Sequence, residues 1–264
     1  MIKESREIRN MFSAIAPRYD LLNHLLSLSI DRYWRWRTVR TVRQQSGSNQ
    51  LVLDLCTGTA DLAILLARTH RVVGCDFSHP MLRIAAEKVI AAKTKGPITL
   101  VEADALRLPF EDAVFDVVTI AFGLRNLEDY DLGLMEMKRV LRPGGTLAVL
   151  EFSEPQFPVL RHAYLFYFSR VLPKVGEWIS GRPGAYSYLC HSVQTFPDRE
   201  ELKAIMARAG FRYLRHSSLT GGIATLHLAC KEEDAVNPVN LSFTLRNGTA
   251  KNQETTLPDP RKHQ

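Results

Sequence analysis

Short apolar, β-branched stretches alternate with helix-patterned stretches between Gln50 and Cys230, and this alternation constrains the fold more than any other feature of the chain. The predicted strands cover residues 51–55, 71–75, 98–102, 115–121 and 146–152. Helical periodicity covers residues 61–68, 80–92 and 130–141, in the gaps between strands. Strands that alternate with helices form a parallel sheet with helices on both faces. The sequence therefore predicts an α/β protein built on a doubly wound sheet.

The first predicted strand runs into a turn of small residues around Gly58 and Thr59 before a helix begins. Small side chains leave room for backbone N–H groups to approach a ligand at the carboxyl edge of a parallel sheet. Asp54 lies near the end of this strand, and Asp76 ends the next strand, roughly 20 residues after the turn, where a carboxylate accepts ribose hydroxyls. A nucleoside-containing ligand is therefore predicted at this edge.

The turn departs from the G-x-G-x-x-G fingerprint of dinucleotide sites, because Thr57 and Ala60 stand where glycine is common. A pyrophosphate needs a closer approach of the backbone than these residues allow. S-adenosylmethionine has no phosphate, so the turn favours it over NAD. An ordinary strand-to-helix turn that binds nothing is the remaining alternative.

The predicted sheet ends differently from that of a dehydrogenase. Phe211–Leu219 and Ile223–Cys230 flank Thr220-Gly221-Gly222, a turn sequence typical of an antiparallel hairpin. A doubly wound, mostly parallel sheet with a C-terminal antiparallel hairpin resembles the class I S-adenosylmethionine-dependent methyltransferases. The dehydrogenase fold has no such hairpin, although a nicotinamide oxidoreductase remains an alternative.

Polar residues also follow the third and fourth predicted strands. Asp104 lies at the rim of the sheet, where its carboxylate can accept the exocyclic amine of adenine and the amide of Ala105 can donate to a ring nitrogen. After the fourth strand, Arg125 and Asn126 offer a cation and an amide that suit an oxygen anion. The Asn/Asp-Pro-Pro-aromatic tetrapeptide of many N-methyltransferases is absent from the sequence, as is the Pro-Cys pair of cytosine C5 methylation.

Several segments together resemble the UbiE/MenG C-methyltransferases of ubiquinone and menaquinone synthesis: Tyr19-Asp-Leu-Leu-Asn23, Phe122-Gly-Leu-Arg-Asn126, Arg139-Val-Leu-Arg-Pro-Gly-Gly145 and Leu150-Glu-Phe-Ser153. The resemblance covers about residues 8 to 230. It implies the transfer of a methyl group from S-adenosylmethionine to a ring carbon of a polyprenylated quinol. The acceptor it implies is demethylmenaquinol, 2-methoxy-6-polyprenyl-1,4-benzoquinol, or both.

The resemblance also implies which residues contact the cofactor. Matching positions are Thr59, Asp76, Asp104 and Ala105, and we add Asp54, Gly58, Asp61 and Ala121 as candidates. Two positions depart from the family pattern. The turn reads Thr57-Gly-Thr-Ala-Asp61 in place of Gly-Gly-Thr-Gly-Asp, and Ala121 replaces a serine before Phe122. The hydrogen bonds near Thr57 and Ala121 are therefore expected to differ from those of the family.

An aromatic carbon becomes nucleophilic when an ortho hydroxyl loses its proton and pushes electron density into the ring. We expect Arg125 and Asn126 to stabilise the resulting oxygen anion. Tyr19 is predicted to position the ring or to relay the proton, and Asp20 is a second candidate base. A helix cap with a packed aromatic ring is the alternative role for Tyr19 and Asp20.

Three domain segments are predicted. Residues 1–49 form an N-terminal helical lid, in which residues 21–28 and 32–43 are helical. Residues 50–231 form the methyltransferase domain, with a helical substrate cap inserted at residues 156–196, and residues 232–264 form a disordered tail. The aromatic side chains of residues 157–180 indicate either a helical cap packed on the sheet or a surface that contacts the lipid tail or a membrane. The arginines of residues 32–43 indicate either a solvated helix or contact with anionic lipid.

Bulk properties are those of an ordinary cytoplasmic protein. The net charge of +6 permits contact with nucleic acid or with an anionic membrane, and an RNA methyltransferase remains an alternative. No apolar stretch reaches the length of a membrane span, and the first residues lack the apolar core of a signal peptide. The four cysteines show no metal-ligand spacing, so we expect buried free thiols and no bound metal. The predicted partners are the quinol substrate and a membrane surface, and no nucleic acid is expected to bind. The sequence does not decide whether the protein forms a homo-oligomer.

Overall fold

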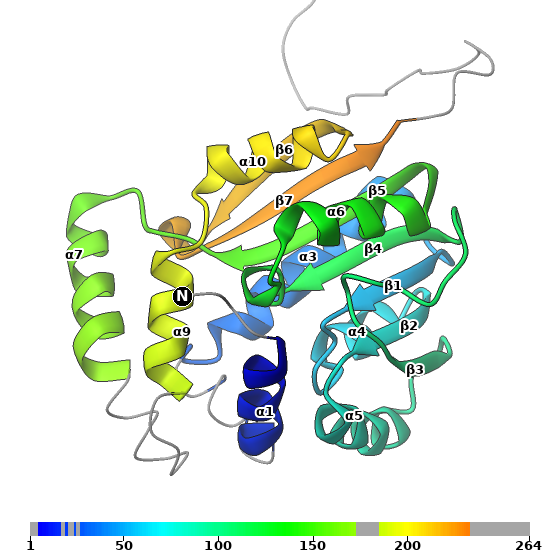
Figure 1. Cartoon of the computed structure of the whole chain (residues 1–264), viewed down its shortest axis with the longest axis horizontal. Helices are drawn as coiled ribbons and strands as arrows, with labels where there is room; N and C mark the ends of the chain where they lie inside the picture. Colours follow the sequence, from blue (N-terminus) through cyan, green and yellow to red (C-terminus); the bar gives the residue numbers. More distant parts are fainter. Residues whose placement is uncertain (1–4, 17–18, 21–23, 25–26, 173–184, 233–264) are drawn as a thin grey trace, which may run out of the picture. The chain divides into compact units, whose positions relative to one another are not determined.

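A computed structural model describes residues 5–16, 19–20, 24, 27–172 and 185–232 of the 264-residue chain (Figure 1). Within these residues, seven strands form one sheet in the order β3-β2-β1-β4-β5-β7-β6. The bounds of the strands are β1 Leu51–Leu55, β2 Arg71–Asp76, β3 Ile98–Glu102, β4 Phe115–Ala121, β5 Leu141–Phe152, β6 Phe211–Leu219 and β7 Ala224–Lys231.

Strands β1 to β5 pair in parallel, and β7 lies antiparallel between β5 and β6. This arrangement confirms the predicted fold class, including the C-terminal hairpin. The predicted strand bounds agree closely except at β5, which begins at Leu141 instead of Thr146. Leu141 pairs with Phe115, and the register then shifts before Thr146 pairs with Val117. The glycine-containing stretch therefore forms an irregular start of the strand, with Gly144 at a φ of 73°.

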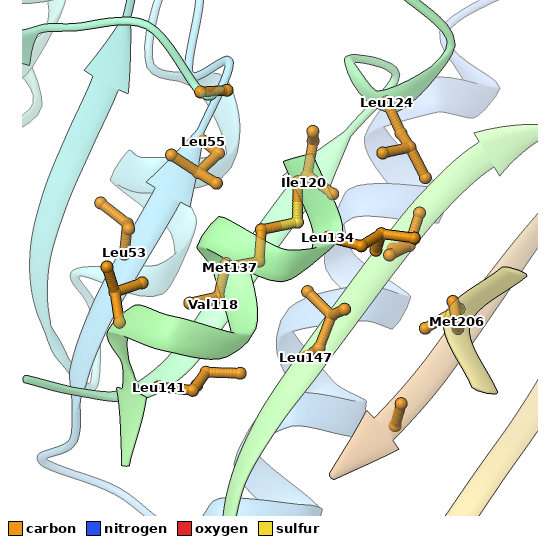
Figure 2. Close-up of a cluster of buried hydrophobic side chains, with 14 of the residues drawn as sticks. Leu53, Leu55, Val118, Ile120, Leu124, Leu134, Met137, Leu141, Leu147 and Met206 are labelled. Atoms are coloured by element: carbon orange, nitrogen blue, oxygen red, sulfur yellow. The ribbon is translucent and has the colours of Figure 1, made fainter. Parts of the chain in front are cut away.

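Helices cover both faces of the sheet. Alternate residues of a strand point to opposite faces, so Leu53 packs in one cluster with α6 (Tyr130–Val140) and α10 (Arg199–Arg208), as Figure 2 shows. Val52 packs on the other face against α3 (Ile30–Ser46), α4 (Asp61–Leu66) and α5 (His79–Ala92). Burial on both faces explains why the strands read as nearly continuous apolar runs.

The N-terminal segment has two parts. Helix α1 (Ser5–Ile15) contacts α5, and the Ser13 hydroxyl lies 3.1 Å from that of Ser78 in the loop after β2. Helix α3 buries Trp34 and Val42 in the core cluster beneath the sheet. Its apolar side packs against β4 and β5, so this part of the predicted N-terminal segment contributes to the core. Residues 21–23 and 25–26 of the predicted helix over 21–28 lie outside the described residues.

The predicted substrate cap contains α7 (Pro158–Phe166), a π-helical turn (Tyr167–Val171) and α9 (Ala185–Gln194). Tyr164, Leu172 and Cys190 from these elements pack together with Ile15 of α1. Residues 173–184, which include Trp178, and residues 233–264 of the predicted tail lie outside the described residues. Among the helices that are described, none combines the length and apolarity needed to cross a bilayer. All four cysteines are free.

Candidate active site

Strands β2 and β3 are added on one side of β1, whereas β4 and β5 are added on the other side. The point where the strand order reverses therefore lies between β1 and β4, and polar groups gather where these two strands end. Ligands of doubly wound sheets bind at this switch point, outside the carboxyl ends of the strands. Here the loops after β1, β2, β3 and β4 line a cavity, and α1 contributes Phe12. Predicted site residues that line this first cavity are Tyr19, Gly58, Asp76, Asp104, Ala105, Ala121 and Asn126.

The carboxylate of Asp76 is fixed at the edge of the first cavity. One oxygen accepts the backbone N–H of Gly58 at 2.9 Å, and the other accepts that of Ser78, also at 2.9 Å. Burial raises the pKa of Asp76, although these N–H groups oppose the shift. Each oxygen keeps a second lone pair, so the carboxylate can accept two adjacent ribose hydroxyls. This agrees with its predicted role.

Gly58 gives the turn after β1 its open side. Its φ is +55°, and a Cβ added there would meet only the Tyr19 ring, at 3.9 Å, within the usual contact range. A side chain would therefore enter the first cavity beside Tyr19. Cys56 and Ala60 also have positive φ, at 51° and 69°. Such backbone strain is typical of turns that are shaped to approach a ligand.

Asp54 lies beneath the turn and does not line the first cavity. Its two oxygens accept the hydroxyls of Thr57 and Thr119, each at 2.7 Å, so it ties the turn to the neighbouring strand β4. Burial raises the pKa of Asp54 to about 6. Asp54, which was predicted to contact the cofactor, therefore lies behind the turn residues that line the first cavity and holds the turn in place.

We expect Asp54 to make stability depend on pH. Its pKa is about 6 in the folded protein and 3.8 in an unfolded chain, so the folded state holds the proton more tightly. The stability that this proton contributes is present below pH 3.8 and is lost as the pH rises through about 6. Denaturant titrations would measure the free energy of unfolding of the wild type and of Asp54→Asn. The wild-type value minus the variant value should decrease as the pH rises from 3.8 to about 6. A difference that stays constant across the interval would contradict the assignment.

Three further predicted residues, Asp20, Thr59 and Asp61, meet in an ion-pair cluster outside both cavities. The Lys88 ammonium lies 2.6 Å from an oxygen of Asp20, 2.5 Å from an oxygen of Asp61 and 3.2 Å from the Thr59 hydroxyl. The Thr59 hydroxyl donates to the other Asp20 oxygen at 2.5 Å. The cluster anchors the segment that carries Tyr19 to α4 and α5. The Asp20 carboxylate is thus held by side-chain partners, and its role as a base stays a prediction.

A second, mostly apolar cavity adjoins the first. Tyr19 and Phe122 line both cavities. The second cavity runs between the start of α3 and the inner side of α7, where its walls include Ile30, Trp34, Phe152, Leu160, Tyr164, Tyr167 and Leu189. Its shape and lining suit a ring with an apolar substituent.

Arg125 brings a cation to the wall of the second cavity. Its guanidinium is buried and lies 2.9 Å from a carboxylate oxygen of Glu151, which is also buried. The same guanidinium nitrogen donates to the carbonyl of Phe122, and the group lies over the Phe152 ring at 5.3 Å. Because the backbone N–H of Arg125 also donates to Glu151, at 3.2 Å, the loop and the pair are held as one unit.

Asn126 lies in the wall of the first cavity. Its amide nitrogen is 3.4 Å from the Phe122 carbonyl, and its amide oxygen accepts the Tyr188 hydroxyl at 3.2 Å. Arg125 and Asn126 thus both contact the carbonyl of Phe122, which lines both cavities. The structure brings both residues to the junction of the two cavities together with Tyr19.

Two residues at the junction were not predicted as site residues. Phe122 has a φ of +57°, a strained value for a bulky side chain, and Glu151 holds Arg125. Both lie in segments that resemble the UbiE/MenG enzymes. A buried glutamate in an otherwise apolar strand was the signal that could have revealed Glu151, because such a charge needs a partner.

Known proteins resemble this chain over nearly the whole of its described length. Residues 1–231 match the ubiE/COQ5 methyltransferase family. A ubiquinone/menaquinone biosynthesis C-methyltransferase of Geobacter sulfurreducens is 47% identical, and the match covers 86% of this chain and 89% of that protein. A demethylmenaquinone methyltransferase of Thermus thermophilus is 51% identical, over 83% of this chain and 98% of that protein.

Solved structures show the same fold at low sequence identity. A methyltransferase of Thermotoga maritima, described as a possible histamine N-methyltransferase, has a TM-score of 0.61 and 18% identity, with 84% of this chain and 99% of that chain covered. A Haemonchus contortus phosphoethanolamine N-methyltransferase, solved with S-adenosyl-L-methionine, has a TM-score of 0.56 and 17% identity, over 75% of this chain and 53% of that chain. Both likenesses concern the fold.

These matches confirm the prediction of an S-adenosylmethionine-dependent methyltransferase and agree with the predicted reaction in quinone biosynthesis. They do not favour an RNA methyltransferase or a nicotinamide oxidoreductase. The match over residues 1–231, together with these relatives, shows that the chain belongs to the ubiE/COQ5 methyltransferase family.

Proposed function

We propose that this protein methylates a ring carbon of a polyprenylated quinol, with demethylmenaquinol, 2-methoxy-6-polyprenyl-1,4-benzoquinol or both as the acceptor. The observation that carries the proposal is the pair of adjoining cavities. One has a polar edge with the fixed carboxylate of Asp76, the other is apolar and contains a buried cation, and Tyr19 and Phe122 line both. Two different reactants can therefore meet at these two side chains.

The first cavity suits S-adenosylmethionine. The Asp76 carboxylate would accept the ribose hydroxyls, while Asp104 and the amide of Ala105 would recognise adenine from the loop after β3. Asp104 is held for this by the backbone N–H of Leu106, which donates to its carboxylate at 2.9 Å. The bound cofactor supplies an electrophilic methyl group on a sulfonium. Gly58 keeps the space beside Tyr19 open for it.

The second cavity suits the quinol. Arg125 and Asn126 would stabilise the negative charge on the deprotonated hydroxyl oxygen, and this charge raises the electron density of the ortho carbon. That carbon then takes the methyl group, and its own hydrogen leaves as a proton to restore the aromatic ring. Tyr19 borders both cavities, so it can orient the ring or pass the hydroxyl proton toward water.

The tail of a polyprenylated quinol needs apolar surroundings outside the ring pocket. Leu160, Tyr164 and Tyr167 on the inner side of α7 and the adjoining turn line the second cavity, and Phe157 and Phe166 are each 65% exposed. These positions support a tail channel that continues toward a membrane surface. Peripheral membrane contact is therefore part of the proposal.

Quinone profiling tests the proposed function. The gene would be deleted and then restored, and quinones would be extracted and identified by mass spectrometry. Deletion should cause a quinone lacking one methyl group to accumulate, and restoration should return the methylated quinone. Restoration with the Asp76→Asn variant should leave the demethylated species. A normal quinone profile in the deletion strain would overturn the proposal.

A further inference from the structure

The outer side of α3 carries exposed aromatic rings next to arginines. Tyr33 and Trp36 are 47% and 45% exposed, and their rings stack at 6.1 Å between centroids. The Arg40 guanidinium lies over the Trp36 ring at 5.5 Å, and Arg32 and Arg43 are exposed on the same helix. We call these five residues the α3 face. It lies opposite the side of the helix that buries Trp34 and Val42 in the core.

The α3 face is basic and has no carboxylate of its own. The one acidic residue of the helix, Asp31, is buried and ion-paired with Arg35. The groove between this face and helices α4 and α5 adds Arg68, whereas Lys88 in the same groove is already ion-paired with Asp20 at 2.6 Å. Its acidic residue, Asp61, is paired with Lys88 at 2.5 Å. The surface therefore complements a negatively charged partner.

The α3 face also lies beside the entrance to the second cavity. Leu28, two residues before the start of the helix, lines that cavity and is nevertheless 78% exposed. Ile30 and Trp34, on the inner side of the same helix, continue the cavity wall. A molecule that docks on the outer side of α3 is thus adjacent to the point where the cavity reaches the surface.

We propose that the α3 face docks on an anionic lipid bilayer and places the mouth of the second cavity at the surface where a polyprenylated quinol resides. Tyrosine and tryptophan rings favour the membrane interface, where one end of the ring is apolar and the other is hydrated. Arginine pairs with lipid phosphates, and several basic residues together attract the protein to an anionic leaflet. The inference rests on the proposed function for its quinol, while the docking itself is a separate property.

Vesicle co-sedimentation of the purified full-length protein tests the proposal. The probes are vesicles of phosphatidylcholine alone and of phosphatidylcholine mixed with phosphatidylglycerol, neither containing quinone. The wild type should bind the mixed vesicles more tightly than the neutral ones. The double variant Arg32→Glu/Arg40→Glu should lower that affinity by about tenfold or more. Tyr33→Ala/Trp36→Ala should lower the affinity for both kinds of vesicle, because it removes the interfacial rings.

The control variants are Arg212→Glu and Tyr213→Ala. Arg212 and Tyr213 lie on the edge strand β6, and Tyr213 is 65% exposed. These variants change the same residue types outside the α3 face and should bind vesicles as the wild type does. Thermal melting would verify that every variant is folded. Equal binding by the α3-face variants and the wild type would overturn the proposal, as would binding of a single-stranded RNA probe without binding of vesicles.

A turnover assay separates this proposal from the proposed function. With a demethylated quinol that carries a single isoprene unit and dissolves in water, the α3-face variants should match the wild type, because none of the five residues lines either cavity. With a long-chain quinol in anionic vesicles, the same variants should be slower than the wild type. A wild type that binds vesicles but methylates neither quinol would refute the proposed function alone.

Discussion

Replacing Asp76 by asparagine should weaken the binding of S-adenosylmethionine by about a hundredfold or more. Hydrogen bonds to a charged acceptor contribute roughly 1.5–3 kcal/mol each, and the carboxylate can accept two ribose hydroxyls. Asparagine removes the charge and replaces one oxygen by an NH₂ group, which would face the backbone N–H of Gly58 or of Ser78. Isothermal titration calorimetry with the cofactor measures the change directly.

Asp104→Asn is the matched control for this change. Asp104 lines the same cavity but is exposed, and its carboxylate accepts the backbone N–H of Leu106 at 2.9 Å. Water competes for an exposed carboxylate, so its loss should weaken cofactor binding less than the loss of Asp76. Because the pKa of Asp76 is raised by burial, wild-type affinity should also fall as the pH is lowered and this carboxylate takes up a proton. Similar dissociation constants for Asp76→Asn and the wild type would refute the assignment.

Replacing Arg125 by lysine should reduce turnover by more than tenfold, equivalent to about 1.4 kcal/mol, with little change in cofactor affinity. Arg125 lines the second cavity and not the first, so cofactor contacts should persist. Lysine keeps the charge beside Glu151, but its single ammonium replaces a planar group that also binds the Phe122 carbonyl and stacks over Phe152. Steady-state kinetics and calorimetry on the same preparation separate the two effects.

The control for this prediction is Arg142→Lys, since Arg142 forms an exposed ion pair with Asp116 at 2.6 Å away from both cavities. Its turnover should match the wild type. Glu151→Ala gives a complementary test, because it removes the buried carboxylate of the Arg125–Glu151 pair and should cost about 3–5 kcal/mol of folding free energy. Near-normal turnover of Arg125→Lys would show that the guanidinium is not needed for the reaction.

The strands could be predicted from the sequence because their pattern has a local cause. Leu53 and Val52 are both buried, on opposite faces, so β1 reads as an uninterrupted apolar run that ends where its polar loop begins. The hairpin turn could be predicted from its two glycines, because glycine adopts positive φ without strain. In the structure Gly221 and Gly222 have φ values of 66° and 96°. The buried side of helix α3 was harder to predict, because its five arginines dominate the sequence pattern while Trp34 and Val42 pack in the core.

The sequence by itself determined the sheet, the switch point between β1 and β4 and the location of Asp76, Asp104 and Arg125 at strand ends, because these follow from short-range patterns. Only the tertiary structure decided which side chains pair. Glu151 lies 26 residues from Arg125, Thr119 lies 65 residues from Asp54, and Lys88 lies 68 residues from Asp20. Such pairs depend on how strands and helices pack in space, so the partners of Asp54 and Asp20 could not be inferred from their place in the sequence.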